Sequence, residues 1–440
     1  MTRRGALYLV LIIVGLVYIA WMLGLGERVR THLAQAEPSG QTVLFVVLDT
    51  VRADHTSACG YSRPTSPNLE RLARDGAMSC DAYAPGSWTF PSHASFFTGR
   101  PVWQHGAHFV GDGTVIRKLS IRPLSEDYDT LAERFVDRGY QTVGLSGNPV
   151  LQPESGLDRG FGVWRAPEQF GPWYGAAFIA QLKELLREEV ATDQPLFLFL
   201  NIADAHDPWF GVPEEVDWAE THEDLRVYFR VDDEGEVIRG DWARYVLGEL
   251  DAGEQQELLV EIRDQYDYGI FKADRTLGEA LDVLAEHGWM EDFRLVVVSD
   301  HGEFLGEHQL LRHGRYLYEE NQRVPLLVVG AEEEIEFPTP VSAMSVHGLV
   351  LDGVLKGWPV EAVAFPDRAW LEFSEGKVGG STSAAIWSSD GKQLWMDGDL
   401  VEGDDSADLD SLVEQTRASA AREVLMDPAL EEALEAAGYL

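Results

Sequence analysis

Basic residues are scarce in this chain of 440 residues, and lysine is the scarcest of them. Only six residues are Lys, and Lys and Arg together number 35 against 74 Asp and Glu, which gives a net charge of −39. A surface of this sign repels nucleic acid and anionic lipid, so we expect no nucleic-acid partner. The acidic residues are spread along the whole sequence, as on a well-solvated surface, and do not by themselves indicate a reaction.

Cysteine is almost absent as well, since Cys59 and Cys80 are the only two. They could form one disulfide outside the cytoplasm, but the sequence does not fix their separation in space. We therefore expect two free, buried thiols. What the chain does contain, 45% hydrophobic residues and 13 Trp, predicts a folded core large enough for one α/β domain and a smaller appendage.

An uncharged apolar run near the N-terminus, residues 6–25, is long enough to cross the hydrocarbon core of a bilayer as a helix. Arg3 and Arg4 precede it and favour a cytoplasmic N-terminus, whereas Arg28 and Arg30 follow it and weaken that preference. We expect a single-pass membrane anchor that places the rest of the chain on the extracytoplasmic side.

A cleaved signal peptide is the alternative interpretation of this segment, because residues 34–36 (Ala-Gln-Ala) resemble a small-x-small cleavage site. That site lies far beyond an apolar stretch that is already longer than a usual signal-peptide core. We therefore favour the uncleaved anchor, with residues 1–41 forming the anchor and its linker.

Strand-like apolar runs alternate with helix-like patterns over residues 42–334. Continuous runs rich in β-branched residues are typical of strands that are covered on both faces. Their alternation with helices predicts an α/β fold with a mostly parallel central sheet and helices on both faces. The predicted strands are residues 43–48, 141–146, 195–200, 294–299 and 324–329. One helical pattern begins at Pro67, a second includes Leu131 and Phe135, and a third runs from Tyr266 to Leu284.

Two regions depart from this alternation. Residues 208–256 are polar and acidic with little strand pattern, which predicts a surface insertion in the main domain. From residue 335 to residue 440 the alternation degrades, and this part is predicted to form a smaller α+β subdomain. The runs at 384–389 and 392–397 indicate a small antiparallel unit in it, followed by an acidic loop and a C-terminal helix.

Polar side chains repeatedly follow the predicted strands. Asp49 follows the first strand, Asp204 and His206 follow the third, and Asp300 and His301 follow the fourth. A lone Asp after a strand is usually a turn former or a helix cap. In parallel sheets, however, sites form at the carboxyl ends of the strands. Carboxylate and imidazole groups gathered there would suit a divalent cation such as Zn²⁺ or Mn²⁺.

A hydroxyl group lies at a predicted helix start in the segment Gly86–Ser95. Pro91 suits the first turn of a helix, which places Thr89 beside a helix N-terminus, where an anion is favoured. Taken alone, Thr-x-Pro-Ser is a common helix start with a purely structural role. Coordination to a divalent cation would instead lower the pKa of the hydroxyl and make it a nucleophile.

Five segments in order resemble the sulfatase family of the alkaline-phosphatase superfamily, and the resemblance extends over residues 42 to about 330. It implies an alkaline-phosphatase-like fold and one divalent metal ion (Mn²⁺, Zn²⁺ or Ca²⁺) bound by Asp49, Asp300 and His301. Thr89 would be both nucleophile and metal ligand. The segments are VLFVVLDTVRADHTSACGYSRPTSPNLERLARDGA, AYAPGSWTFPSHASFFTG, LFLFLNIADAHDPW, VVVSDHGEFLGEHQLLRHG and LYEENQRVPLLV.

The same resemblance assigns roles to His206, His313 and His93, and Asp204 is a separate candidate. His206 would lie near the leaving group, as an acid or a substrate contact, and His313 would bind substrate oxygens. Asp204 is expected to contact the substrate. His93 occupies the position of an Arg that supports the nucleophile in true sulfatases.

Departures from the family pattern bear on the substrate. True sulfatases oxidise a Cys or Ser to formylglycine, whereas Thr89 has a methyl group on Cβ and cannot yield that aldehyde. His93 replaces the Arg, and Thr50 replaces a second acidic residue. We therefore expect a hydrolase of phosphate esters or diesters, small or carried by lipids or glycans. The alternatives are a strict sulfatase, a phosphoglycerol- or phosphoethanolamine-type transferase, and a degenerate, non-enzymatic binding protein.

Overall fold

The computed structural model describes residues 41–116, 119–209, 211–214, 216–222, 229–231, 237–239, 241–314, 316–364, 383–388, 391–396 and 399–402. The predicted membrane anchor, residues 6–25, and the predicted C-terminal helix lie outside the described residues. Within the described part, no helix is both long enough and apolar enough to cross a membrane.

The centre of the fold is an eight-stranded sheet with the strand order β14-β2-β13-β10-β1-β7-β5-β6. Strand β13 runs antiparallel to both of its neighbours, and the other pairs in the sheet are parallel. The predicted α/β fold with a mostly parallel sheet is confirmed. The strands are β1 (Thr42–Leu48), β2 (Gly76–Tyr83), β5 (Gln141–Ser146), β6 (Val163–Arg165), β7 (Leu196–Ile202), β10 (Phe293–Ser299), β13 (Arg323–Val329) and β14 (Val341–Ser342).

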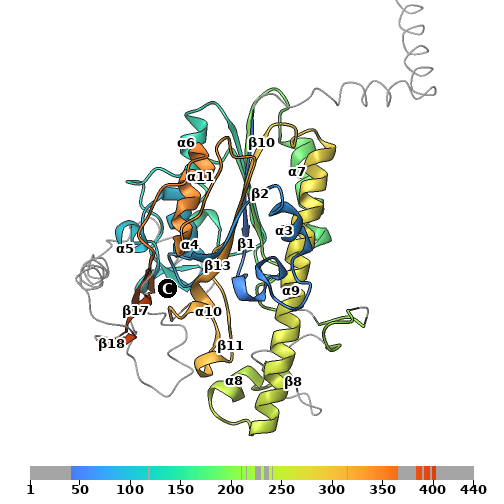
Figure 1. The fold of residues 1–440 in the computed structure, drawn as a ribbon, viewed down its shortest axis with the longest axis vertical. Helices are drawn as coiled ribbons and strands as arrows, with labels where there is room; N and C mark the ends of the chain where they lie inside the picture. Colours follow the sequence, from blue (N-terminus) through green and yellow to red (C-terminus); the bar gives the residue numbers. More distant parts are fainter. Residues whose placement is uncertain are drawn as a thin grey trace, which may run out of the picture.

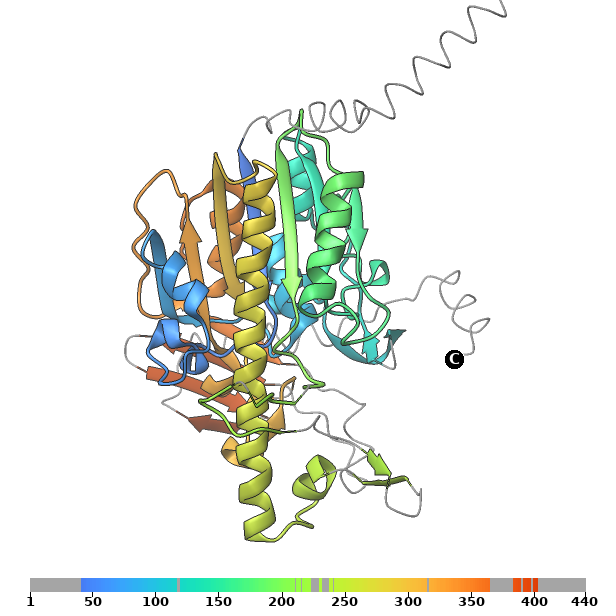
Figure 2. The same ribbon diagram turned by 90° about the vertical axis from the view of Figure 1, so that its right-hand side faces the viewer.

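Helices cover both faces of this sheet (Figures 1 and 2). One face is packed by α4 (Thr89–Thr98), α6 (Leu131–Val136) and α11 (Val346–Asp352), and the other by α3 (Pro67–Leu72), α7 (Ala176–Glu188) and α9 (Ala252–Glu286). Successive side chains of a strand point to opposite faces, so Val43, Phe45 and Val47 enter the first core while Leu44, Val46 and Leu48 enter the second.

The predicted insertion over residues 208–256 has more regular structure than its sequence indicated. It contains the hairpin of β8 (Phe229–Val231) and β9 (Val237–Arg239), the helix α8 (Asp241–Val246) and the first turn of α9. Helix α9 begins there because Asp251 and Glu254 form a reciprocal capping box. Figure 2 shows the N-terminal half of α9 projecting below the sheet together with α8 and this hairpin.

The described C-terminal residues form a four-stranded antiparallel sheet, as the runs at 384–389 and 392–397 predicted. Its strands are β15 (Glu361–Ala364), β16 (Ser383–Ser388), β17 (Gly391–Met396) and β18 (Asp399–Glu402). The remaining elements are η1 (Ala53–His55), η2 (Ser57–Cys59), α5 (Val102–His105), β3 (Phe109–Ile116), β4 (Leu119–Ile121), η3 (Pro153–Ser155), β11 (Phe304–Leu305), η4 (Glu307–Gln309), β12 (Leu311–Arg312), α10 (Glu319–Gln322) and η5 (Ala343–Ser345).

The two cysteines form a disulfide, so the expectation of free, buried thiols was wrong. Cys59 ends η2 and Cys80 lies in β2, and their Cα atoms are 5.7 Å apart. Both residues are partly exposed rather than buried. The sequence could not show this pairing, because the packing of η1 and η2 against the sheet sets the distance between the two residues.

Reducing this disulfide should lower the free energy of unfolding by about 3 kcal/mol, because the bridge closes a loop of 21 residues in the unfolded chain. Urea unfolding with and without a reducing agent measures the change. A variant with Cys59→Ala and Cys80→Ala should match the reduced protein and not respond to the reductant. Equal stability of the oxidised and reduced proteins would contradict the prediction.

Candidate active site

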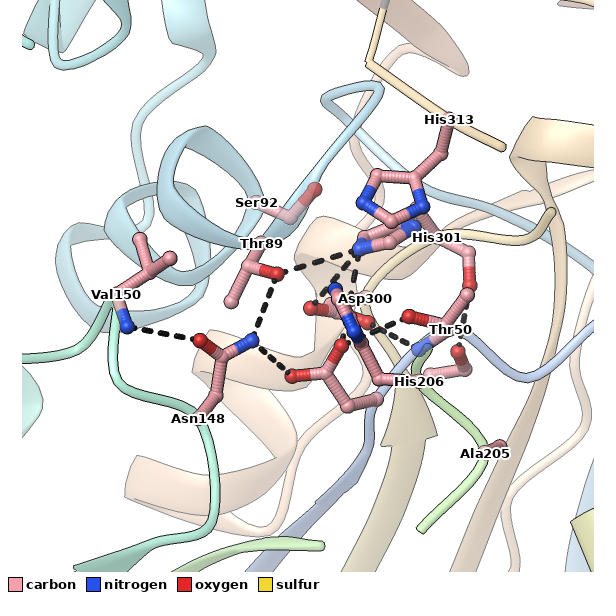
Figure 3. A network of polar contacts seen from close by, with 12 residues as sticks. Thr50, Thr89, Ser92, Asn148, Val150, Ala205, His206, Asp300, His301 and His313 are labelled. Atoms are coloured by element: carbon pink, nitrogen blue, oxygen red, sulfur yellow. Dashed lines mark hydrogen bonds and ion pairs between the residues drawn. The ribbon is translucent and has the colours of Figure 1, made fainter. Parts of the chain in front are cut away.

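Four parallel strands deliver polar side chains to one edge of the central sheet. β1, β7, β5 and β10 run in the same direction, so their carboxyl ends meet at this edge. Asp49 follows β1, Asp300 and His301 follow β10, Asn201 lies near the end of β7, and Asn148 follows β5. Figure 3 shows Asp300, His301, Asn148 and Thr89 converging there.

Asp49, Asp300 and His301 form a buried cluster in which one ligand atom of each lies within 4.8 Å of the others. His301 Nε2 is 3.5 Å from Asp300 Oδ2 and 3.9 Å from Asp49 Oδ1. His301 Nδ1 donates to the carbonyl oxygen of Gly302 at 2.9 Å. This bond fixes the tautomer, so the lone pair of Nε2 faces the two carboxylates.

The electrostatics of this cluster fit a divalent cation. Burial, reinforced by the charge of Asp49, raises the pKa of Asp300 well above its usual value, and Asp300 Oδ2 has no hydrogen-bond partner among the described residues. Burial lowers the pKa of His301 to about 4, so its imidazole is neutral at pH 7. Two carboxylates and a neutral imidazole are ligands of Zn²⁺ and Mn²⁺, and a cation would offset the buried negative charge.

Asp49 is the more readily ionised of the two carboxylates. Burial opposes its ionisation, yet the nearby imidazoles of His206 and His301 and two amide hydrogen bonds lower its pKa below the usual value. The amides are those of Asn148 and Asn201, which donate to Asp49 Oδ2 at 2.8 and 3.0 Å. Asp49 is therefore a charged anchor of the cluster near neutral pH.

Thr89 is the first residue of α4, and its hydroxyl reaches the cluster. Thr89 Oγ1 lies 3.3 Å from His301 Nε2, and Asn148 Nδ2 donates to it at 3.2 Å. Its side chain is buried, and no side chain caps the helix start at Trp88. The sequence-based hypothesis required Thr89 to lie beside Asp49, Asp300 and His301, and its contact with His301 of this cluster meets that requirement. Figure 3 shows Thr89 beside Asp300 and His301.

His93 holds the first turn of α4 in place. Its Nδ1 donates to the carbonyl oxygen of Thr89 at 2.8 Å, and Asn201 Nδ2 lies 3.4 Å from its Nε2. Burial lowers the pKa of His93 to about 4, so the ring is neutral near pH 7. His93 is thus placed to support Thr89 through the helix backbone rather than to donate a proton.

Thr50 supports both carboxylates of the cluster. Its backbone N–H donates to Asp300 Oδ1 at 3.0 Å, and its hydroxyl donates to Asp49 Oδ1 at 2.9 Å. This requires a φ of +66°, a left-handed conformation that is strained for a β-branched residue. The hydroxyl of Tyr266 stabilises the turn, because it donates to Thr50 O at 2.7 Å and accepts from Arg52 N at 2.9 Å.

His206 and His313 lie next to the cluster (Figure 3). The ring of His313 is 4.3 Å from that of His301 and 5.1 Å from that of His206, measured between ring centroids. His206 also stacks on Phe170 at 4.2 Å with nearly parallel planes. His313 shares a hydrogen bond at 3.1 Å with the buried Glu303, and burial lowers its pKa well below the usual value.

Comparison with known proteins identifies the family. Residues 41–345 match the family model described as Sulfatase. The chain belongs to the sulfatase family. As a member of this family, the chain is an enzyme, a hydrolase that acts on sulfate or phosphate esters.

Individual relatives of this sulfatase-family chain are distant in sequence. The uncharacterized sulfatase YidJ of Escherichia coli K12 is 23% identical over 412 residues, 80% of this chain and 78% of YidJ. The N-acetylglucosamine-6-O-sulfatase of Bacteroides thetaiotaomicron is 21% identical over 370 residues, 66% of this chain and 63% of that protein. The fold is shared with the phosphonate monoester hydrolase of Agrobacterium radiobacter, with a TM-score of 0.57, 19% identity and coverage of 91% and 96% of the two chains.

Asp204 is the one predicted site residue of this sulfatase-family chain that lies apart from the cluster. Burial raises its pKa to about 6, and the groups that oppose this shift include Lys272 and Thr276 of α9. Neither of its carboxylate oxygens has a hydrogen-bond partner among the described residues, although Asp204 and His206 are only two residues apart. Residues after a strand end can point in either direction, because the loop and not the strand sets their orientation.

Asn148, Asn201 and Thr50 contact the cluster but were not predicted as site residues. Asn148 and Asn201 lie at the ends of the predicted strands 141–146 and 195–200, where the rule about strand ends would have included them. Thr50 carried no signal in its residue type, because its role depends on a backbone conformation that threonine rarely adopts.

Proposed function

We propose that this sulfatase-family enzyme hydrolyses phosphate esters or diesters, with Thr89 as the nucleophile. The observation that carries the proposal is the position of an unmodified threonine hydroxyl 3.3 Å from His301 Nε2, next to the cluster of Asp49 and Asp300. The family pattern implies that true sulfatases use an aldehyde made from Cys or Ser. The branched Cβ of threonine excludes that modification, and a phosphoryl group can be transferred to the hydroxyl directly.

Asp49, Asp300 and His301 would hold one cation, with Thr89 as a further ligand. The imidazole among the ligands favours Zn²⁺ or Mn²⁺ over Ca²⁺, which prefers oxygen ligands throughout. When bound, such a cation lowers the pKa of a coordinated hydroxyl and neutralises charge on a phosphoryl oxygen. These are the two effects that a threonine nucleophile needs at neutral pH.

The residues around Thr89 supply orientation and a proton. Asn148 donates to Thr89 Oγ1, which aims the oxygen toward the cluster and leaves a lone pair for attack on phosphorus. The Thr89 hydroxyl loses its proton to solvent and its oxygen forms a bond to phosphorus while the ester bond breaks; His206 donates a proton to the departing oxygen and later regains one from the water that attacks the phosphothreonine. Water then cleaves the phosphothreonine and returns Thr89 to its starting state. His313 contacts the phosphoryl oxygens.

We further propose that the catalytic domain acts outside the cytoplasm, attached to the membrane by residues 6–25. The uncharged run in the sequence supports an anchor. The disulfide between Cys59 and Cys80 supports an oxidising compartment, since such bonds are rare in the cytosol. Protease accessibility of the domain in intact cells or spheroplasts tests this orientation, and a domain protected until lysis would contradict it.

A panel of p-nitrophenyl substrates tests the reaction itself. Phosphate monoester, phosphodiester, phosphonate ester and sulfate ester are assayed with Mn²⁺, Zn²⁺, Ca²⁺ or Mg²⁺ added to the metal-depleted enzyme. We expect a phosphorus ester to give a kcat/KM at least tenfold above that of the sulfate ester, with Mn²⁺ or Zn²⁺ the most effective. Dominant sulfate hydrolysis would overturn the proposal and leave the strict sulfatase.

A further inference from the structure

A second cavity, of about 370 Å³, lies at the end of α4 that is farthest from the nucleophile. Thr89 begins this helix, while Thr98, Gly99 and Arg100 at its other end line the cavity. Thr89 and Thr98 are nine residues apart, and at a rise of 1.5 Å per residue about 14 Å separates the two ends of the helix. Figure 1 shows α4 beside α6 and α11, which supply further lining residues, and no residue of the catalytic cluster takes part.

The charge of this cavity differs in sign from that of the chain. Arg100, Arg134 and Lys356 line it against the carboxylates of Asp127 and Asp129, whereas the whole chain has 35 basic and 74 acidic residues. Salt screens exposed charges beyond about 8 Å at physiological ionic strength, so the local cations dominate here. The cavity therefore suits a ligand that carries an anionic group.

Arg100 is the cation available for that group. Arg134 is paired with Asp129 at 2.8 Å, and Lys356 is paired with Asp352 at 2.7 Å. Arg100 is exposed, and no ion pair or hydrogen bond joins its side chain to any other described residue. A guanidinium offers parallel N–H donors that match the oxygens of a sulfate or phosphate group.

Aromatic rings and hydrogen-bonding groups form the rest of the lining. Trp358 lines the cavity and contributes an indole ring to its wall. His347 Nδ1 donates to Phe96 O at 3.1 Å, so Nε2 remains an acceptor, and burial lowers the pKa of this ring to about 4. Tyr128 adds a second ring. The indole and phenol rings and the hydrogen-bond acceptors of the cavity suit a ligand whose ring carries many hydroxyl groups.

We propose that this cavity binds one sugar unit bearing a sulfate or phosphate group, as a second site separate from the catalytic cluster. Arg100 binds the oxyanion, Trp358 contacts the sugar ring, and His347 and Asp127 accept hydrogen bonds from its hydroxyls. The site binds without chemistry. The inference concerns binding alone and holds whichever ester the catalytic cluster cleaves.

Calorimetric titration of the full chain tests this site. The probes are glucose 6-phosphate, glucose 6-sulfate, glucose and inorganic phosphate. The proteins are wild type, Arg100→Ala, Trp358→Phe, and the control Arg187→Ala, which removes an exposed arginine that is paired with Glu188 on α7. We expect both substituted sugars to bind wild type and control equally, at least tenfold more weakly to Arg100→Ala, and severalfold more weakly to Trp358→Phe.

The outcomes separate this site from the active site. Turnover of the preferred p-nitrophenyl ester should be unchanged in Arg100→Ala, because Arg100 is remote from Thr89. Equal affinity of the substituted sugars for wild type and Arg100→Ala would overturn the proposal, because any binding would then occur elsewhere. Phosphate alone binding as tightly as glucose 6-phosphate would also overturn it. Loss of all ester hydrolysis would refute the proposed function and leave this titration unaffected.

Discussion

Replacing Thr89 by Ala is expected to lower kcat for the preferred ester at least about a thousandfold, because the variant loses the attacking oxygen. Thr89→Ser retains a hydroxyl at the same place beside His301, so this variant should keep most of the wild-type activity. Steady-state kinetics on one p-nitrophenyl ester measures both. Since Asp49, Asp300 and His301 remain, the Ala variant should still bind the cation, which metal analysis after dialysis verifies.

A control on the same helix separates chemistry from packing in this experiment. Ser92 is buried one turn further along α4, and its hydroxyl donates to Gly86 O at 3.3 Å. Ser92→Ala removes an equally buried hydroxyl and should keep kcat within about threefold of wild type. Turnover of the Thr89→Ala variant within tenfold of wild type would remove Thr89 from the mechanism.

Asp300→Asn should abolish stoichiometric metal binding, and with it ester hydrolysis. The substitution keeps the shape of the side chain, but it removes one of the two carboxylates that face His301 Nε2. An amide is a weaker ligand than a carboxylate for Zn²⁺ or Mn²⁺, so affinity should fall at least about a hundredfold. Titration of the metal-free protein, followed by metal analysis of the dialysed sample, gives the affinity and the stoichiometry.

Asp204→Asn is the matched control, because Asp204 is also buried and follows a strand of the same sheet but does not belong to the cluster of Asp49, Asp300 and His301. It should bind one cation as wild type does. A fall in activity with the metal retained would support the predicted substrate contact of Asp204. Full metal binding by Asp300→Asn would contradict the prediction and show that other residues hold the cation.

The central sheet and most of the cluster could be predicted, because both follow from a simple pattern. A short, mainly apolar run such as 43–48 or 294–299 predicts a strand that is buried on both faces of the sheet. Asp49 and Asp300 come directly after these two runs. Parallel strands then bring these residues to one edge. The helix start near Pro91 could be predicted from the residues, whereas the place of Thr89 beside Asp49, Asp300 and His301 was expected only from the resemblance to the sulfatase family.

What could not be predicted depends on contacts between distant segments. The apolar run at 324–329 predicts a strand but not the direction of that strand relative to its neighbours. Only the pairing with β10 and β2 shows that β13 is antiparallel. The disulfide between Cys59 and Cys80 depends likewise on how η2 packs beside β2. The surroundings of Asp204 could not be predicted either, because Lys272 and Thr276, which influence its pKa, lie more than sixty residues further along the chain.

The left-handed turn at Thr50 has a consequence for the linkage between folding and metal binding. A free peptide of this sequence would rarely adopt that turn, so Tyr266 and the sheet maintain it only when the domain is folded. In the unfolded chain the ligands Asp49, Asp300 and His301 are far apart, so the cation has no preformed site there. A cation that binds only the native state therefore stabilises the folded domain, and the melting temperature rises with the logarithm of the cation concentration once this exceeds the dissociation constant.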